Sequence, residues 1–177
     1  MLRTILNVLV TVLVVFAVLV AVQPAEFRVA RSSTISAPPP AVFARVNDLH
    51  AFQEWSPWAK RDPAMKYSYE GPQSGPGAVY RWEGDSEVGA GSMTITESRP
   101  SELVRMKLEI LKPFRTINIV EFTFEPQGDQ TAVTWSMAGT NNLTGKAVRL
   151  FMDMDRIVGG DFEKGLADLG SLVESPG

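Results

Sequence analysis

Few folds accommodate a chain in which apolar and polar residues alternate as regularly as they do here. Residues 103–111 show the pattern best, with Val104, Met106, Leu108 and Ile110 set against Arg105, Lys107 and Glu109. Successive side chains of a β-strand point to opposite faces of the sheet, so one face of this strand is apolar and the other charged. The pattern predicts an antiparallel sheet with one buried face and one face in water.

The alternation recurs along most of the chain. Residues 27–35 predict a first strand, and turn residues separate six further strands at 66–70, 78–83, 91–98, 103–111, 116–124 and 131–137. Outside 103–111, the side chains directed inward are Tyr80, Trp82, Met93, Ile95, Val120, Phe122, Phe124, Val133, Trp135 and Met137. The buried face of the sheet is therefore expected to be rich in aromatic and methionine side chains.

A long helix is predicted at the C-terminal end of the sequence, over residues 145–174. Its apolar stripe consists of Val148, Phe151, Met152, Val158, Phe162, Leu166, Leu169 and Val173. Asn142 or Thr144 would cap its N-terminus. Roughly 30 residues give a helix of about 45 Å, which must lie along another element. Two short helices, at 41–47 and 50–54, are expected between the first two strands.

An uncharged apolar run, Ile5–Val22, lies near the start of the sequence. As a helix it spans roughly 27 Å, close to the hydrocarbon thickness of a bilayer. The alternative is a cleaved signal peptide, but the run exceeds the usual core of about 7–15 residues and no small-residue cleavage site follows it. We expect residues 1–24 to form one transmembrane anchor and residues 25–177 to form one domain. Basic residues flank the run on both sides, which leaves the side of the membrane undetermined.

Composition excludes several classes of function. Without Arg3, residues 25–177 contain 16 basic and 20 acidic residues and no basic block, so nucleic acid is not expected as a partner. The chain has no cysteine and one histidine, His50, for which a surface or turn role is expected. A histidine-based zinc site or a serine triad would lack partners. We therefore expect neither a metal nor a cofactor.

Five segments carry a resemblance to a known superfamily: ISAPPPAVF (35–43), WSPWAKRDP (55–63), GPGAVYRW (75–82), GSMTI (91–95) and DFEKGL (161–166). With the order of the predicted elements, they resemble the helix-grip superfamily called SRPBCC. It includes START lipid-transfer domains, pollen-allergen-like proteins and polyketide cyclase/dehydrase-like proteins. The resemblance covers about residues 27–173. It implies an α+β fold in which a seven-stranded curved antiparallel sheet wraps around a long C-terminal helix, preceded here by one transmembrane helix.

The same resemblance implies a deep hydrophobic cavity between the sheet and the C-terminal helix, but no single reaction. The side chains expected to contact a ligand there are Trp55, Trp58, Tyr80, Trp82, Met93, Met106, Phe122, Trp135, Met137, Phe151, Met152 and Asp155. Trp55 and Trp58 have two compatible interpretations. Both could plug one end of the sheet with their N–H groups satisfied by carbonyls, or one could lie in the core and the other at the cavity mouth.

Two features of the predicted C-terminal helix leave alternatives open. Gly159, Gly160, Gly165 and Gly170 disfavour the helix, and they indicate either close approach to the sheet or a bend that admits a ligand. Asp155 is the one ionisable residue that the apolar stripe turns inward. It is a weak candidate for a catalytic carboxyl with a raised pKa, and pairing with Arg149 or Arg156 is the alternative.

Three functions are compatible with the sequence. The leading hypothesis is membrane-tethered binding of a hydrophobic small molecule or lipid in the cavity. The second, which the resemblance suggests, is an enzyme of the polyketide cyclase or dehydratase type that uses the same cavity. The third is a structural or partner-binding domain whose interior is fully packed.

Overall fold

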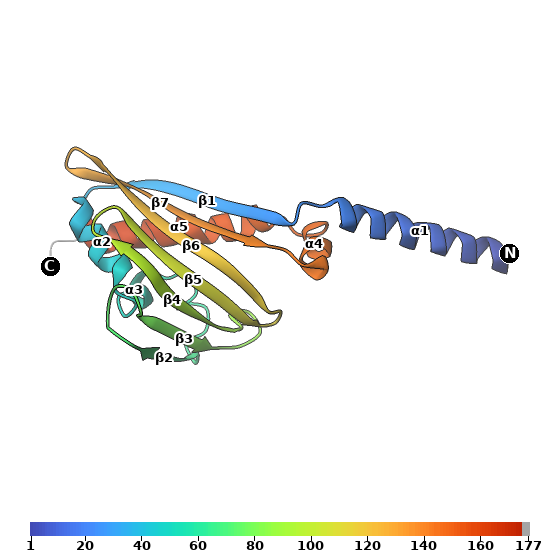
Figure 1. The fold of residues 1–177 in the computed structure, drawn as a ribbon, viewed down its shortest axis with the longest axis horizontal. Coiled ribbons are helices and arrows are strands. Elements are labelled where there is room, and N and C mark those ends of the chain that lie inside the picture. Colours follow the sequence, from blue (N-terminus) through green and yellow to red (C-terminus); the bar gives the residue numbers. More distant parts are fainter. Residues whose placement is uncertain (175–177) are drawn as a thin grey trace.

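The computed structural model describes residues 1–174, which form five helices and seven strands (Figure 1). The helices are α1 (Leu2–Val22), α2 (Pro39–Asn47), α3 (Phe52–Trp55), α4 (Leu143–Arg149) and α5 (Met154–Glu174). The strands are β1 (Glu26–Ile35), β2 (Lys66–Glu70), β3 (Val79–Glu83), β4 (Ala90–Arg99), β5 (Leu103–Lys112), β6 (Thr116–Gln127) and β7 (Gln130–Thr140). All seven predicted strands are present, with bounds that differ by three residues or fewer.

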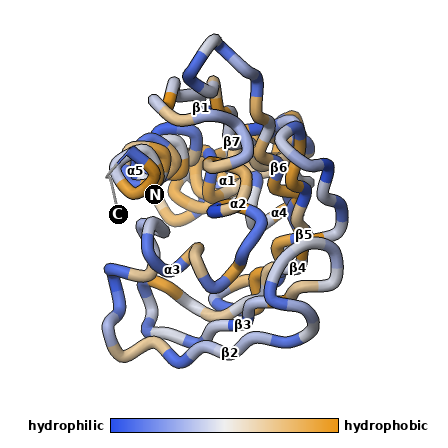
Figure 2. The backbone as a smooth tube through the Cα atoms, turned by 90° about the vertical axis from the view of Figure 1, so that its left-hand side faces the viewer, coloured by the Kyte–Doolittle hydropathy of each residue, from blue (hydrophilic) through white to orange (hydrophobic). Residues whose placement is uncertain are grey.

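The seven strands form one antiparallel sheet in the order β1-β7-β6-β5-β4-β3-β2. Figure 2 shows the strands following one another around the interior, with α5 beside β1 on the open side. The predicted parity is confirmed, since Val104, Met106 and Phe122 are fully buried whereas Ile117 and Ile119 of β6 face outward. A seven-stranded sheet therefore packs on a long C-terminal helix, as the resemblance implies.

The buried core joins α2, α3 and α5 to the inner face of the sheet. Phe162, Leu166 and Leu169 of α5 are almost fully buried, because the apolar stripe of this helix faces the sheet. Rings of the sheet and the helix meet directly, with Trp135 of β7 stacked on Phe162 at 4.2 Å between centroids. This contact packs one side of α5 against β7, the strand next to the edge strand β1.

The prediction of one unbroken C-terminal helix is wrong. Residues 150–153 separate α4 from α5, and Phe151 and Met152 are exposed instead of facing inward. A carboxylate oxygen of Asp153 accepts a hydrogen bond from the backbone N–H of Arg156 at 3.1 Å, which caps a new helix start. The predicted cap on α4 is confirmed, because Asn142 Oδ1 accepts a hydrogen bond from the backbone N–H of Gly145 at 2.9 Å.

Helix α1 projects away from the domain (Figure 1). It is the one helix among residues 1–174 that is long and apolar enough to cross a membrane, which fits either an anchor or a signal sequence. Its last turns touch the α4 region. The Phe16 ring lies 6.2 Å from the Phe151 ring, and Lys146 Nζ donates a hydrogen bond to the carbonyl of Ala21 at 3.4 Å.

Candidate ligand cavity

A cavity of about 710 Å³ lies between the inner face of the sheet and α5. Strands β3 to β7 form the sheet side of its wall, through inward side chains such as Tyr80, Met93 and Val120. Helix α5 closes one side with Val158 and Phe162. The curved sheet encloses more space than the side chains of α5 fill. Apolar side chains of the sheet and of α5 therefore face one another across an open space.

Most of the predicted ligand contacts line this cavity. They are Trp58, Tyr80, Trp82, Met93, Phe122, Trp135, Met137, Phe151, Met152 and Asp155. Trp55 and Met106 do not line it, since both are fully buried in the core behind the wall. The sheet residues follow directly from strand parity, whereas Phe151 and Met152 reach the cavity from the α4–α5 junction and not from an inward helical stripe.

The two tryptophans of the loop have separate positions. Trp55 is 0% exposed and meets the rings of Phe122 and Trp135 edge-on at 5.8 and 5.6 Å. Trp58 is half-buried, packs against Trp135 at 5.8 Å and lines the cavity. One indole therefore belongs to the core and the other to the cavity wall. The expectation that a carbonyl satisfies each N–H is wrong for Trp55, whose Nε1 has no hydrogen-bond partner among the described residues.

Sequence reasoning missed a set of polar side chains that line the cavity. Three of them, Ser56 Oγ, Asn141 Nδ2 and Arg149 Nη1, bury an atom without a hydrogen-bond partner within residues 1–174, as does Nε1 of Trp135, which the sequence did predict. Each of these atoms can donate a hydrogen bond, and a buried donor left unpaired is costly. These four atoms have almost no accessible surface, so they lie behind the wall of the cavity and do not face its open space. Extending the parity of β7 past Met137 and Gly139 would have found Asn141.

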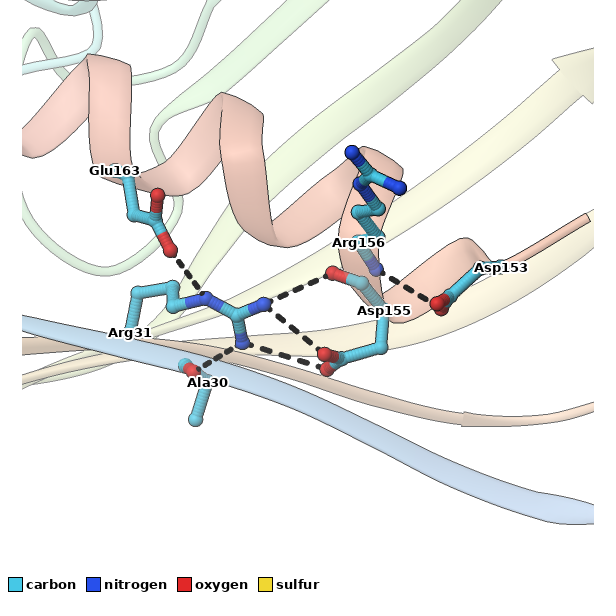
Figure 3. Close-up of polar contacts among 6 residues, drawn as sticks. All are labelled: Ala30, Arg31, Asp153, Asp155, Arg156 and Glu163. Atoms are coloured by element: carbon cyan, nitrogen blue, oxygen red, sulfur yellow. Dashed lines mark hydrogen bonds and ion pairs between the residues drawn. The ribbon is translucent and has the colours of Figure 1, made fainter.

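Arg31 of β1 clamps α5 against the edge of the sheet (Figure 3). Its Nε lies 2.7 Å from Glu163 Oε1, and its Nη2 lies 3.0 Å from Asp155 Oδ2. Gly159 lies four residues from each carboxylate on the same side of α5, where a Cβ would collide with the guanidinium. This glycine therefore permits close approach of β1 to α5, as one of the two alternatives for the glycines predicts.

Asp155 differs from its expected state in two respects. It pairs with Arg31 and not with Arg149 or Arg156, and its side chain is 60% exposed. The hydrogen bond from Arg31 holds the pKa of Asp155 below its ordinary value, whereas burial would have raised that pKa. A carboxylate that stays ionised at neutral pH is poorly suited to the role of a general acid.

Acidification is expected to weaken the Arg31 clamp. The pKa of Asp155 is depressed in the folded state, so its contribution to stability is complete above the ordinary aspartate pKa of about 4 and is lost as the pH falls through the folded value. Melting temperatures of the wild-type chain and of Arg31→Gln, measured at a series of pH values from neutral to below that point, should converge as the pH falls. Parallel curves would show that the clamp does not stabilise the domain.

The titratable groups in and around the cavity do not form a pair typical of acid–base catalysis. Burial raises the pKa of Tyr80, which lines the cavity, and raises the pKa of Tyr69 to about 12, so both phenols are neutral at physiological pH. His50 is exposed and stacks on Tyr69 at 3.7 Å between centroids. Within residues 1–174, no three His, Cys, Asp or Glu side chains are grouped so that they could hold a metal ion.

Comparison with solved structures identifies the fold. Protein CV1439 from Chromobacterium violaceum is 16% identical with a TM-score of 0.61, over 87% of this chain and 100% of that chain. The Zhui aromatase/cyclase from Streptomyces sp. R1128 is 14% identical with a TM-score of 0.61, over 84% and 94% of the two chains. Ara h 8.0201 is 14% identical with a TM-score of 0.58, over 85% and 99%. At these identities the likeness shows the helix-grip fold alone.

Sequence comparison gives the family. None of the curated proteins matches this sequence. The family described as "Polyketide cyclase / dehydrase and lipid transport" matches residues 26–174. That match spans the whole sheet and every helix around the cavity, and the chain therefore belongs to this polyketide cyclase/dehydrase and lipid transport family.

Proposed function

We propose that this protein is a membrane-tethered binding protein that holds a hydrophobic small molecule or lipid in the cavity between the sheet and α5. The observation that carries the proposal is the cavity itself, about 710 Å³ of space with a largely apolar and aromatic wall. Ligand sites typically have volumes of about 300–1,000 Å³ and a mostly apolar lining with a few polar groups. A domain with a fully packed interior, the third hypothesis, would have no such space.

Desolvation would drive binding. Burial of roughly 300 Å² of apolar ligand surface contributes on the order of 7 kcal/mol at about 25 cal/mol per Å², before the costs of immobilisation. Polar side chains in the wall, among them Asn141 and Arg149, favour an amphiphile over a pure hydrocarbon. The tether would keep the cavity next to a bilayer, where amphiphiles of this kind are abundant.

Binding is favoured over catalysis by the state of Asp155. A cyclase or dehydratase reaction needs a group that exchanges a proton near neutral pH. Arg31 holds Asp155 in the ionised form, and Tyr80 has a raised pKa. An ionised Asp155 and a neutral Tyr80 fit a site that holds a ligand in position. They fit less well a site that transfers protons to and from the ligand.

Partly filling the cavity should weaken binding without unfolding the domain. Leu108 of β5 lines the cavity, whereas its neighbour Lys107 faces away from it. We expect Leu108→Trp to weaken binding of the co-purified amphiphile about tenfold, equivalent to about 1.4 kcal/mol, and so to lower the fraction of chains that carry it. Lys107→Trp is the matched control and should keep the wild-type fraction.

Native mass spectrometry of the full chain, released from detergent, measures this fraction, and circular dichroism checks that both variants fold. If Leu108→Trp retains the amphiphile at the wild-type level, the ligand is bound outside the cavity, for example along α1. Loss of the amphiphile in both variants would also contradict the proposal, since Lys107 lies on the outer face of the sheet.

A further inference from the structure

Exposed apolar side chains gather at the end of the domain from which α1 leaves. The β5–β6 hairpin contributes Leu111 at the end of β5, Phe114 in the turn and Ile117 at the start of β6. The α4 region contributes Leu143, Phe151 and Met152. Figure 1 shows this turn and α4 at the α1 end of the domain, with the β6–β7 turn at the opposite end. We call residues 111–117 and 143–153 the anchor-side rim.

The rim is distinct from ordinary surface apolar residues. Residues 23–174 include nine exposed large hydrophobic side chains, and six of them lie in the rim. Leu143 is 71% exposed and Phe151 is 78% exposed. The β6–β7 turn at the other end is QGDQ and has none. A clustered apolar surface of this kind indicates a partner.

The charge of the rim specifies the chemistry of that partner. The rim contains the basic residues Lys112, Arg115, Lys146 and Arg149 and one acidic residue, Asp153. Lys112 pairs with Glu83, but within residues 1–174 neither Arg115 nor Arg149 forms an ion pair. Basic residues interspersed with Leu and Phe are typical of surfaces that bind anionic lipid headgroups and insert apolar side chains between them.

The position of α1 favours a bilayer over a protein as the partner. The ring contact between Phe16 and Phe151 and the hydrogen bond from Lys146 to Ala21 hold the rim against the last turns of α1. If α1 crosses a bilayer, these contacts bring the rim to the bilayer surface. The helix that tethers the domain, α1, would then also place the apolar rim against the bilayer.

The rim also borders the cavity. Phe151, Met152 and Asp153 belong to the rim, line the cavity and are exposed. We propose that the anchor-side rim docks on a bilayer that contains anionic phospholipids, so that the cavity opens toward the membrane. Phe114, Leu143 and Phe151 insert among the headgroups, and an amphiphile passes between bilayer and cavity without crossing bulk water. The docking rests on the membrane tether of the proposed function.

The absence of cysteine from the sequence makes a direct test possible. Single cysteines replace Phe114, Phe151 and, as the control, Asp129 in the β6–β7 turn, all of which are exposed in the structure. Each full-length variant is labelled with an environment-sensitive fluorophore and reconstituted in vesicles of phosphatidylcholine and phosphatidylglycerol. We expect blue-shifted emission and strong quenching by spin-labelled lipids for the probes at 114 and 151, and neither effect at 129.

Vesicles of phosphatidylcholine alone, and the double variant Arg115→Glu/Arg149→Glu, should both reduce the quenching at position 114. Rim probes that remain as exposed to water as the probe at 129, in protein that floats with the vesicles, would overturn the docking and leave the tether intact. Protein that does not float with the vesicles would overturn the tether and the docking together. Equal quenching in both vesicle types would contradict the role assigned to the basic residues.

Discussion

Trp55→Ala is expected to lower the free energy of unfolding by about 3–5 kcal/mol, the range for truncation of a large buried aromatic side chain. Trp55 is fully buried and touches Phe52, Phe122 and Trp135. Its removal therefore leaves a void between rings of α3, β6 and β7. Trp58→Ala should cost much less, because the Trp58 ring is already half-exposed at the cavity wall.

Urea unfolding of the full chain in detergent, followed by near-ultraviolet circular dichroism, measures both changes. The matched pair separates the two positions because the substitutions are chemically identical and lie three residues apart. Equal losses of stability would contradict the assignment of Trp55 to the core and Trp58 to the cavity wall. The Trp58 variant should instead lose co-purified amphiphile while remaining folded.

The sheet was predictable because its signal is local. Alternation in β5 and β6 shows directly which side chains face inward, and these residues supply much of the cavity wall. Antiparallel neighbours joined by short turns then need little further information to find their register. For the same reason the sequence could place Tyr80, Phe122 and Trp135 on a common inner face before the structure was known.

The clamp between β1 and α5 was not predictable in this way. Arg31 and Asp155 lie 124 residues apart in the sequence, and no local pattern connects them. Helical periodicity placed Asp155 on the inward stripe, and its side chain does line the cavity. Asp155 lies in the first turn of α5, however, where Arg31 of β1 reaches it and its side chain stays largely exposed.

The break before α5 determines where Phe151 and Met152 lie. One continuous helix would have kept both side chains on the apolar stripe that faces the sheet. Asp153 instead caps a new helix and leaves both side chains exposed at the edge of the cavity. The periodicity of apolar residues does not reveal this break. The break depends on one side chain, that of Asp153, whose hydrogen bond to the backbone competes with continuation of the helix.

The glycines of α5 permit a second matched comparison, on one helix. Gly165→Ala is expected to destabilise the domain by about 1–3 kcal/mol, the range for overpacking of a core. A Cβ at this position would lie 2.6 Å from the Trp135 ring and 3.2 Å from Pro57. The Trp135 ring is buried and stacked on Phe162, so it has little room to move. The gain of up to about 1 kcal/mol from alanine as a better helix former only partly offsets this clash.

Gly160→Ala should have the opposite effect and raise the free energy of unfolding by up to about 1 kcal/mol, since no atom lies within 4 Å of the added Cβ. The same urea titration compares the two variants. Opposite signs would show that α5 is held against the sheet at Gly165, which keeps the helix from moving away to admit a ligand. If Gly165→Ala also stabilises the domain, the helix yields easily at this point, and the alternative of a soft helix that opens for a ligand would hold.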